Sequence, residues 1–241
     1  VSVTATVADA ATGTATSGSD HVAFGSQTVV FGAGAVGGDV QSVNLGLLDD
    51  LIIEGDEDVD LSITAVTGPG ASAGAQPNHQ ITILDNDFAQ IEFVLPASSV
   101  LEPIPGEIVD LQLVGVPGVS IGPGVFVTAD VFDTGSGSAT SGADYPVFGI
   151  QTAVFGPGTL IGDTQPILTG ILDDLLLEGL ETFELSIGTV TGPGVSTGAQ
   201  SAHQVSIIDD EVVSVQFSLS GSSTPETAPT EIIALELVAA P

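Results

Sequence analysis

The sequence predicts an all-β fold, and three observations lead to that expectation. The 241 residues are rich in Val, Ile, Thr, Ser and Gly, with 31 glycines and 14 prolines, a composition typical of short strands joined by tight turns. Apolar and polar residues alternate with a period of two in several short segments, and no segment has the periodicity of an amphipathic helix. The third observation is an internal repeat with an offset of 124 residues.

The repeat consists of four motifs that occur twice in the same order. Each pair is separated by 124 residues without a gap, as in GTATSGSD (13–20) and GSATSGAD (137–144), GLLDDLIIEGDEDVDL (46–61) and GILDDLLLEGLETFEL (170–185), VTGPGASAGAQ (66–76) and VTGPGVSTGAQ (190–200), and ITILDNDFAQIEF (81–93) and VSIIDDEVVSVQF (205–217). A fixed offset over the whole chain indicates tandem copies of one structural unit.

Seven strands are predicted in the uninterrupted copy of the repeat. They span residues 90–95, 108–114, 125–132, 152–155, 166–172, 182–187 and 204–208. In the sixth, Phe183, Leu185 and Ile187 lie on one face, while Thr182 and Glu184 lie on the other. Seven short strands separated by turn residues predict an immunoglobulin-like sandwich of two sheets for each 124-residue repeat.

The repeat boundaries predict a permuted frame. Val1 aligns with Val125, so residues 1–87 are expected to be a module without its first two strands. Residues 88–211 are expected to be a complete module, and residues 212–241 the first two strands of a further one. A sandwich without two strands exposes a sheet edge and part of its core, so an adjoining segment or subunit is expected to complete it.

Two arrangements of neighbouring copies satisfy this frame. The repeats could follow one another covalently in a longer tandem array. Alternatively, separate subunits could form a homopolymer in which each donates its first two strands to the next. Both arrangements produce a fibre, and both make copies of the same repeat the expected partners.

The charge balance excludes several classes of partner. The chain has 31 acidic residues and neither Lys nor Arg, so it cannot neutralise phosphates, and nucleic acid is not expected to bind. Membrane insertion is not expected either, because the uncharged run 111–129 contains Pro117 and Pro123. The absence of cysteine excludes disulfides and thiolate metal sites.

The acidic residues are predicted to gather at one end of each sandwich. Successive connections alternate between the two ends, and the Gly/Pro-rich end of residues 88–211 carries a single acid, Asp163. The other end holds nine of the sixteen acids in this range: Glu102, Asp144, Asp173, Asp174, Glu178, Glu181, Asp209, Asp210 and Glu211. Two carboxylates 4 Å apart repel by roughly 4 kcal/mol at an effective dielectric constant near 20. Such a cluster needs bound cations, raised pKa values or wide separation.

Ca²⁺ is the cation that best suits this end of the sandwich. Calcium accepts six to eight oxygen ligands from several loops in flexible geometry. Zinc and copper prefer imidazole or thiolate ligands, which this end lacks apart from His21. The alternative is an acidic face that is merely solvated.

The repeated motifs resemble those of Calx-beta domains, the Ca²⁺-binding sandwiches of sodium–calcium exchangers and of many bacterial surface proteins. In residues 88–211 the resemblance implies the ligands Glu102, Asp144, Asp173, Asp174, Glu178, Glu181, Asp209 and Asp210. In residues 1–87 it implies Asp20, Asp49, Asp50, Glu54, Glu57, Asp85 and Asp87, with Glu226 supplied by a neighbouring module. The chain departs from the family pattern where Leu51, Leu175 and Leu180 replace possible acids, where Asn86 interrupts one acidic run, and where Glu211 ends the other.

The remaining polar residues are expected to have no catalytic or ligand role. No GxSxG motif or oriented acid–base pair is present, so the chain is not expected to be an enzyme. His79 and His203 are expected at exposed positions, and His21 is expected to pack beside Asp20. Glu92, Asp110, Asp130 and Asp133 are expected to face solvent from the strands.

The sequence therefore predicts a structural calcium-binding repeat of an extracellular filament, adhesin stalk or matrix protein. Ca²⁺ at the acidic end is expected to stiffen each module and the joint to the next. One alternative is a cell-surface adhesion module that binds a glycan or a protein through the Gly/Pro-rich loops. Another is a calcium sensor, which a titration would distinguish from a constitutive structural site.

Overall fold

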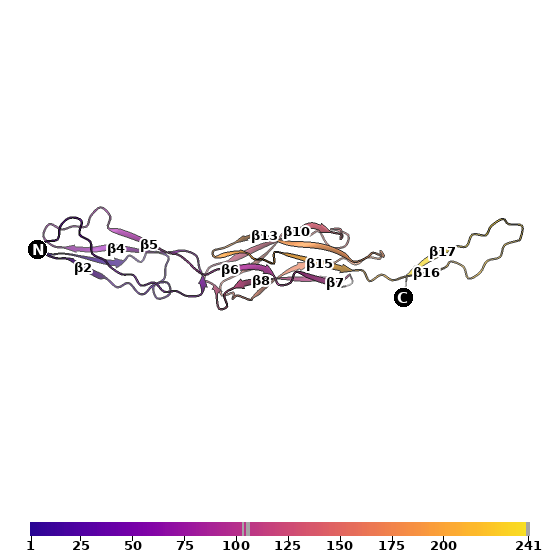
Figure 1. Cartoon of the computed structure of the whole chain (residues 1–241), viewed down its shortest axis with the longest axis horizontal. Helices are drawn as coiled ribbons and strands as arrows, with labels where there is room; N and C mark the ends of the chain where they lie inside the picture. Colours follow the sequence, from indigo (N-terminus) through magenta and orange to yellow (C-terminus); the bar gives the residue numbers. More distant parts are fainter. Residues whose placement is uncertain (103, 105–106, 240–241) are drawn as a thin grey trace.

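The computed structural model describes residues 1–102, 104 and 107–239, and in these residues all regular secondary structure is β. Figure 1 shows an elongated molecule in which the modules follow one another along the long axis. The predicted all-β class and sandwich architecture are confirmed. Within the described part of the chain, no helix has the length and apolar character needed to cross a membrane.

Residues 88–211 form a sandwich of two sheets. The first sheet has the strand order β11 (Gln151–Phe155), β10 (Val127–Gly137), β13 (Glu181–Thr191), β15 (Ala202–Ile208) and β7 (Ala97–Leu101). The second has the order β12 (Thr164–Thr169), β8 (Glu107–Gly115), β6 (Ala89–Phe93) and β14 (Val195–Thr197). Their facing side chains, including Phe93, Phe155 and Phe183, form one continuous buried core.

The seven strands predicted for this module correspond to β6, β8, β10, β11, β12, β13 and β15. Two further strands of the sandwich, β7 and β14, were not predicted, because ASSVL and VST carry no run of alternating apolar residues. Both pair in parallel with strands distant in the sequence, β7 with β15 and β14 with β6. Pairing of this kind depends on the assembled sheet and leaves little trace in the local pattern.

Residues 1–87 form one four-stranded sheet with the order β2 (Gln27–Phe31), β1 (Val3–Asp9), β4 (Glu57–Thr67) and β5 (Asn78–Ile83). It repeats the order of β11, β10, β13 and β15, and its register is the same: Val3 pairs with Phe31 as Val127 pairs with Phe155. No second sheet covers it in the described structure, and its inward-facing side chains are mostly half-buried.

A short two-stranded sheet joins the two modules. Strand β3 (Ile52–Ile53) pairs in parallel with β9 (Ser120–Ile121). The N–H of Ser120 donates to the Leu51 carbonyl at 3.0 Å, and the N–H of Gly122 donates to the Ile53 carbonyl at 2.9 Å. Ile53 is buried with the core of residues 88–211, so the sandwich extends into the preceding module.

The approach at this joint requires a glycine. A Cβ on Gly122 would lie 2.6 Å from Cγ of Glu54 and 3.0 Å from the carbonyl oxygen of Ile53. Because real Cβ atoms essentially never lie this close to another heavy atom, any other residue here would force the Glu54 side chain or the β3 backbone to move. The predicted contact between the acidic end of one module and the Gly/Pro-rich end of the next is therefore present.

The last described strands, β16 (Val213–Phe217) and β17 (Leu235–Ala239), form an antiparallel hairpin. Figure 1 shows it projecting from the end of the molecule opposite to residues 1–87. We call residues 212–239 the terminal hairpin.

Candidate metal centre

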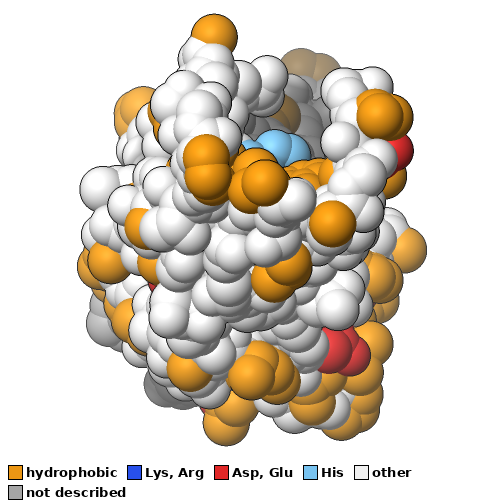
Figure 2. Space-filling model, turned by 90° about the vertical axis from the view of Figure 1, so that its left-hand side faces the viewer, with side chains coloured by type: hydrophobic (Ala, Val, Ile, Leu, Met, Phe, Trp, Pro, Cys, Tyr) orange, Lys and Arg blue, Asp and Glu red, His pale blue; other side chains and the backbone are white. Residues whose placement is uncertain are grey.

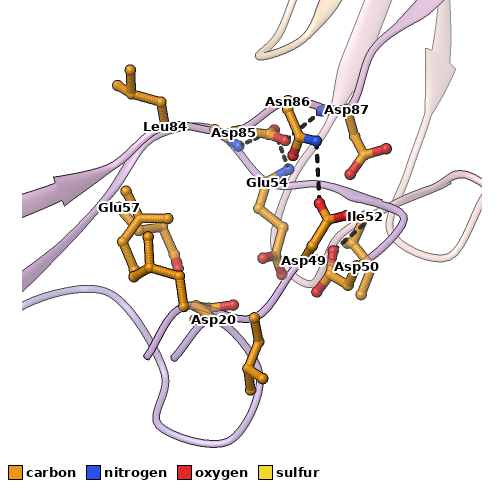
Figure 3. A pocket seen from close by; sticks show the side chains of 14 residues that line it. Asp20, Asp49, Asp50, Ile52, Glu54, Glu57, Leu84, Asp85, Asn86 and Asp87 are labelled. Atoms are coloured by element: carbon orange, nitrogen blue, oxygen red, sulfur yellow. Dashed lines mark hydrogen bonds between the residues drawn. The ribbon is translucent and has the colours of Figure 1, made fainter. Parts of the chain in front are cut away.

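The acidic segments of residues 1–87 converge on one pocket of about 290 Å³, which we call site 1. Its acidic lining residues include all seven ligands predicted for the first copy: Asp20, Asp49, Asp50, Glu54, Glu57, Asp85 and Asp87. They come from three separate segments, the 13–20 turn, the 46–61 repeat motif and the run that follows β5 (Figure 3).

Hydrogen bonds from backbone N–H groups to Asp85 hold the 46–61 motif against the run that follows β5. Its carboxylate accepts the N–H groups of Glu54 at 3.0 Å and Gly55 at 2.9 Å, and it also accepts the N–H of Asp87 at 2.9 Å. Asn86 donates from Nδ2 to Asp49 at 3.1 Å, as drawn in Figure 3. Asn86 therefore ties two acidic segments together, although it interrupts the acidic run.

Three carboxylates of site 1 lie close enough to share one cation. Asp20, Asp50 and Glu54 each offer one oxygen, and these oxygens lie within 4.8 Å of one another. Asp20 is held in place because its carboxylate accepts the N–H of Thr16. Figure 3 shows Asp20, Glu54 and Glu57 extending toward a common space.

The equivalent segments of residues 88–211 form site 2. One group contains Glu102, Asp210 and Glu211, and a second contains Asp144, Glu178 and Glu181, with oxygens within 4.8 Å in each group. Asp209 has the structural role of Asp85: its carboxylate accepts the N–H of Glu178 at 2.6 Å and of Glu211 at 3.1 Å. Besides Asp209, two of the predicted ligands, Asp173 and Asp174, belong to neither group. Asp173 is exposed, whereas the charge of Asp174 acts on Glu102 and Glu178.

Glu211 joins a ligand group although it was not among the predicted ligands. The sequence contained the signal for it, because Glu211 lies 124 residues after Asp87, which was predicted as a ligand. Glu226, the counterpart of Glu102, is exposed in the terminal hairpin and belongs to neither site.

The pKa values of several carboxyl groups at these sites are raised well above their ordinary value. Burial, reinforced by the charges of Asp209 and Glu211, raises the pKa of Glu102 to about 7. Burial together with Asp144 raises the pKa of Glu181 to about 7, and burial together with Asp20 does the same for Glu57. Among the described residues, the buried Oε2 atoms of Glu102, Glu181 and Glu211 have no hydrogen-bond partner.

This donor set fits a hard divalent cation. Each group offers only carboxylate oxygens, the ligand type that Ca²⁺ takes, and a bound cation would supply the missing partner of the buried oxygens. Asp20, Asp50 and Glu54 would hold it at site 1. The groups of Glu102 and of Asp144 would hold ions at site 2.

The histidines lie outside these groups. His21 is buried and its Nδ1 lies 3.0 Å from the Val22 carbonyl oxygen, in agreement with the expected packing role. The expectation that His203 is exposed was wrong. Its ring faces the core beside Phe93, Ser98 Oγ of the neighbouring strand β7 lies 2.9 Å from Nε2, and the Leu95 carbonyl oxygen lies 2.7 Å from Nδ1. His79, its counterpart in the uncovered sheet, is exposed.

Three of the acids expected to face solvent, Asp130, Asp133 and Glu92, also have structural partners, and Asp130 accepts the hydroxyl of Thr152 at 2.6 Å. Asp133 accepts the hydroxyl of Tyr145 at 2.8 Å, and Tyr145 in turn stacks on Phe183. Glu92 accepts the N–H of Ala199 at 2.7 Å and so anchors the loop between β14 and β15. These contacts stabilise the sandwich and do not extend the metal sites.

Comparison with known proteins identifies one family model that matches both copies of the repeat. A model of the Calx-beta domain family matches residues 1–87 and 126–211. Among solved structures, the apo form of the Calx CBD1 domain is 22% identical, with a TM-score of 0.43, covering 52% of this chain and 99% of that one. The CBD12 structure from CALX1.2 is 16% identical, with a TM-score of 0.40, covering 85% of this chain and 87% of that one. Comparison with curated proteins gave no match.

The two matches to the family model cover most of the chain and coincide with the two copies of the repeat. Calx-beta domains are calcium-binding modules rather than catalytic units, and Ca²⁺ is the metal that the acidic groups of both copies suit. The chain belongs to the Calx-beta domain family.

Proposed function

We propose that this chain is a structural calcium-binding repeat of an extracellular filament, adhesin stalk or matrix protein. In this role Ca²⁺ closes the acidic loops of each module and fixes the joint between successive modules. The observation that supports the proposal is that one segment contributes carboxylates to site 1 and also forms the strand that pairs with the next module. Residues 49–55 carry Asp50 and Glu54 of site 1 and also form β3, which pairs with the next module.

The electrostatics supply the mechanism. Without a cation, the carboxylates of site 1 repel one another, and the protein has no Lys or Arg to offset them. Separation of Asp20 from Asp50 and Glu54 would displace the segment that donates β3 to the joint. A bound cation holds the three carboxylates together and so keeps β3 in place for pairing with β9.

Amide hydrogen exchange at the joint tests this mechanism. In saturating Ca²⁺ we expect strong protection of the Ser120 and Gly122 amides, whose hydrogen bonds cross the joint. After chelation we expect this protection to fall by at least tenfold, while the amides between β10 and β13 serve as an internal reference. Unchanged protection at Ser120 and Gly122 without calcium would contradict the proposal.

A matched pair of variants separates the site from general charge effects. Asp50→Asn removes a carboxylate of site 1, whereas Glu231→Gln removes an exposed acid of the terminal hairpin that lies outside every ligand group. We expect only Asp50→Asn to weaken calcium binding in a calorimetric titration and to reduce the protection of the joint amides. Equal effects of the two variants would point to nonspecific charge reduction.

The alternative of an adhesion module that binds through the Gly/Pro-rich loops has less support at the joint between residues 1–87 and 88–211. The Gly/Pro-rich loops of residues 88–211 face the preceding module there: Gly122 approaches Ile53, and Gly194 approaches the Asp87 carbonyl oxygen. These contacts occupy part of the loop surface at the joint, so a glycan or protein ligand would compete with the preceding module for it. The calcium-sensor alternative is tested by the same calorimetric titration.

A further inference from the structure

Among the residues that the structure describes, two apolar surfaces of this chain have no partner, and they are counterparts of surfaces that do pack together. In residues 88–211, strands β6 and β8 cover the inner face of the sheet formed by β11, β10, β13 and β15. The repeat counterpart of β6 and β8 is the terminal hairpin. The counterpart of the sheet is the uncovered sheet of β2, β1, β4 and β5, which we call the open sheet.

The terminal hairpin has one apolar face, and that face is exposed. Phe217 and Leu237 are 62% and 70% exposed, whereas their counterparts Phe93 and Leu113 are each 1% exposed. Val215, Ile233 and Leu235 lie on the same apolar face and are also exposed. The other face is mixed, with Ser214, Gln216 and Glu236 beside Ile232 and Val238, so the large apolar side chains are concentrated on one face. A hairpin with a solvated apolar face is expected to dock onto a complementary apolar surface.

The open sheet supplies that surface. Its inward-facing residues Val3, Ala5 and Val7 are only half-buried, whereas their counterparts Val127, Ala129 and Val131 are fully buried beneath β6 and β8. Figure 2 looks along the molecule from the N-terminal end and shows a hollow with hydrophobic side chains at its floor.

Both surfaces already have the register that docking requires. In the terminal hairpin Val215 pairs with Leu237, as Ile91 pairs with Leu113 in the packed module. The open sheet likewise has the register of the covered sheet. The hairpin and the open sheet lie at opposite ends of the molecule with residues 88–211 between them (Figure 1), so a hairpin cannot reach the open sheet of its own chain.

We propose that the terminal hairpin of one copy docks onto the open sheet of a second copy and completes it as a sandwich. This inference deepens the proposed function and rests on it, because it names the partner that builds the filament. The contact is heterologous and does not close on itself, so repetition of it produces a head-to-tail filament. Main-chain pairing at the sheet edge would add to the apolar contact.

The packed module specifies two further contacts in this interface. Ser222 is the counterpart of Ser98, so it would meet the exposed His79 of the second copy as Ser98 meets His203. Glu226 is the counterpart of Glu102, so it would enter site 1 of the second copy beside Asn86 and Asp87. Site 1 is therefore completed by a carboxylate from the neighbouring copy.

Mixed-cysteine cross-linking tests the proposed register. The chain has no cysteine, so His79→Cys in one preparation and Ser222→Cys in another introduce one thiol each. Mixed with Ca²⁺ under mild oxidation, these variants are expected to form a disulfide-linked dimer. Ser214→Cys, on the mixed face of the same hairpin, is the control and should not cross-link to His79→Cys.

The oligomeric state provides the second measurement. Sedimentation of the 241-residue chain in Ca²⁺ should show species well above the 23.9 kDa monomer. The double variant Phe217→Asp, Leu237→Asp should remain monomeric, whereas Ser214→Asp should assemble like the parent chain. The double variant should still fold, because no residue of the terminal hairpin belongs to the buried core. A monomeric parent chain without the cross-link overturns the proposal and leaves the open sheet to a different strand donor.

Calcium titration separates this inference from the proposed function. The monomeric double variant should still bind Ca²⁺ at site 2, because every residue of that site lies outside the hairpin. If the parent chain binds Ca²⁺ but does not assemble, only the docking proposal is overturned. Assembly without any calcium binding would overturn the proposed function and leave the docking proposal standing.

Discussion

Residues 1–87 and the matching part of residues 88–211 are two copies of one repeat in different surroundings. The four strands β2, β1, β4 and β5 pair in the same order as β11, β10, β13 and β15. One segment of the repeat differs between the copies. Residues 164–169 form β12, whereas the equivalent residues 40–45 form no strand. Strand β12 pairs only with β8, and the first copy has no described strand in that position. The pairing of one sheet is thus intrinsic to the repeat, while the second sheet requires the first two strands.

The joint gives a second comparison of the same kind. Ile53 is 1% exposed because β3 packs against the following module, whereas its counterpart Leu177 is 56% exposed. The motif therefore forms a strand only where a neighbouring loop pairs with it. The following predictions compare counterpart positions, and they begin with the largest expected effect.

Truncation of an aromatic residue should destabilise the protein at the packed position and have little effect at its counterpart in the terminal hairpin. Phe93→Ala is expected to lower the free energy of unfolding of residues 88–211 by about 3–5 kcal/mol, because it leaves a cavity in a buried core. Phe217→Ala, at the counterpart position, should change this free energy little in the monomer. Chemical denaturation measures both, and equal losses would show that the hairpin packs within its own chain.

Calcium removal should destabilise both modules. At a free Ca²⁺ concentration of 100 Kd, one site contributes about 2.7 kcal/mol, which corresponds to a melting temperature higher by on the order of 10 °C for a domain of this size. Calorimetry in Ca²⁺ and in chelator measures the difference. Magnesium at equal concentration is the control, because it accommodates a flexible all-carboxylate site poorly. An unchanged melting temperature in chelator would argue against structural calcium sites.

The metal-free protein should lose stability as the pH rises. Glu102 and Glu181 have folded-state pKa values raised to about 7 from an ordinary value of 4.5. The folded state therefore binds more protons than the unfolded state between these values, so stability present below pH 4.5 is lost progressively up to about pH 7. The melting temperature in chelator should fall across this interval. Saturating Ca²⁺ should oppose the fall, because the cation competes with these protons.

Substitution at the joint should open it without disrupting either module. Gly122→Ala places a Cβ against Glu54 and Ile53, and we expect a cost of about 1–3 kcal/mol, seen as reduced protection of the joint amides. Gly149→Ala is the control, since a Cβ there meets nothing within 4 Å. Small-angle scattering should show a broader range of inter-module angles only for Gly122→Ala.

The smallest expected effect concerns the buried histidine. Ser98→Ala removes the hydroxyl 2.9 Å from His203 Nε2, and it should lower the free energy of unfolding by about 1 kcal/mol. In the monomer, Ser222→Ala should cost nothing measurable, because the counterpart His79 is solvated in the open sheet. If Ser222→Ala lowers stability only in the assembled protein, the comparison becomes sharper, since assembly would then create the contact between Ser222 and His79 of a second copy.

The sequence by itself determined the repeat, the strands with clear alternation and most of the acidic residues that gather at the candidate sites. Strand β13 was predictable because Phe183, Leu185 and Ile187 alternate with polar residues, a pattern that local geometry enforces. Site 1 was predictable because its acids occur in the order of a family motif, and the structure brings all seven into one pocket.

Only the tertiary structure decided the contacts that depend on a distant strand. Strands β3 and β9 exist through each other, and His203 is buried because Phe93 of β6 packs against its ring and β7 pairs beside its strand. The division of site 2 into two carboxylate groups, with Glu211 in one of them, follows from how four chain segments meet at the end of the sandwich. Local alternation records which side of a strand is apolar, whereas the identity of the covering strand is set by long-range packing.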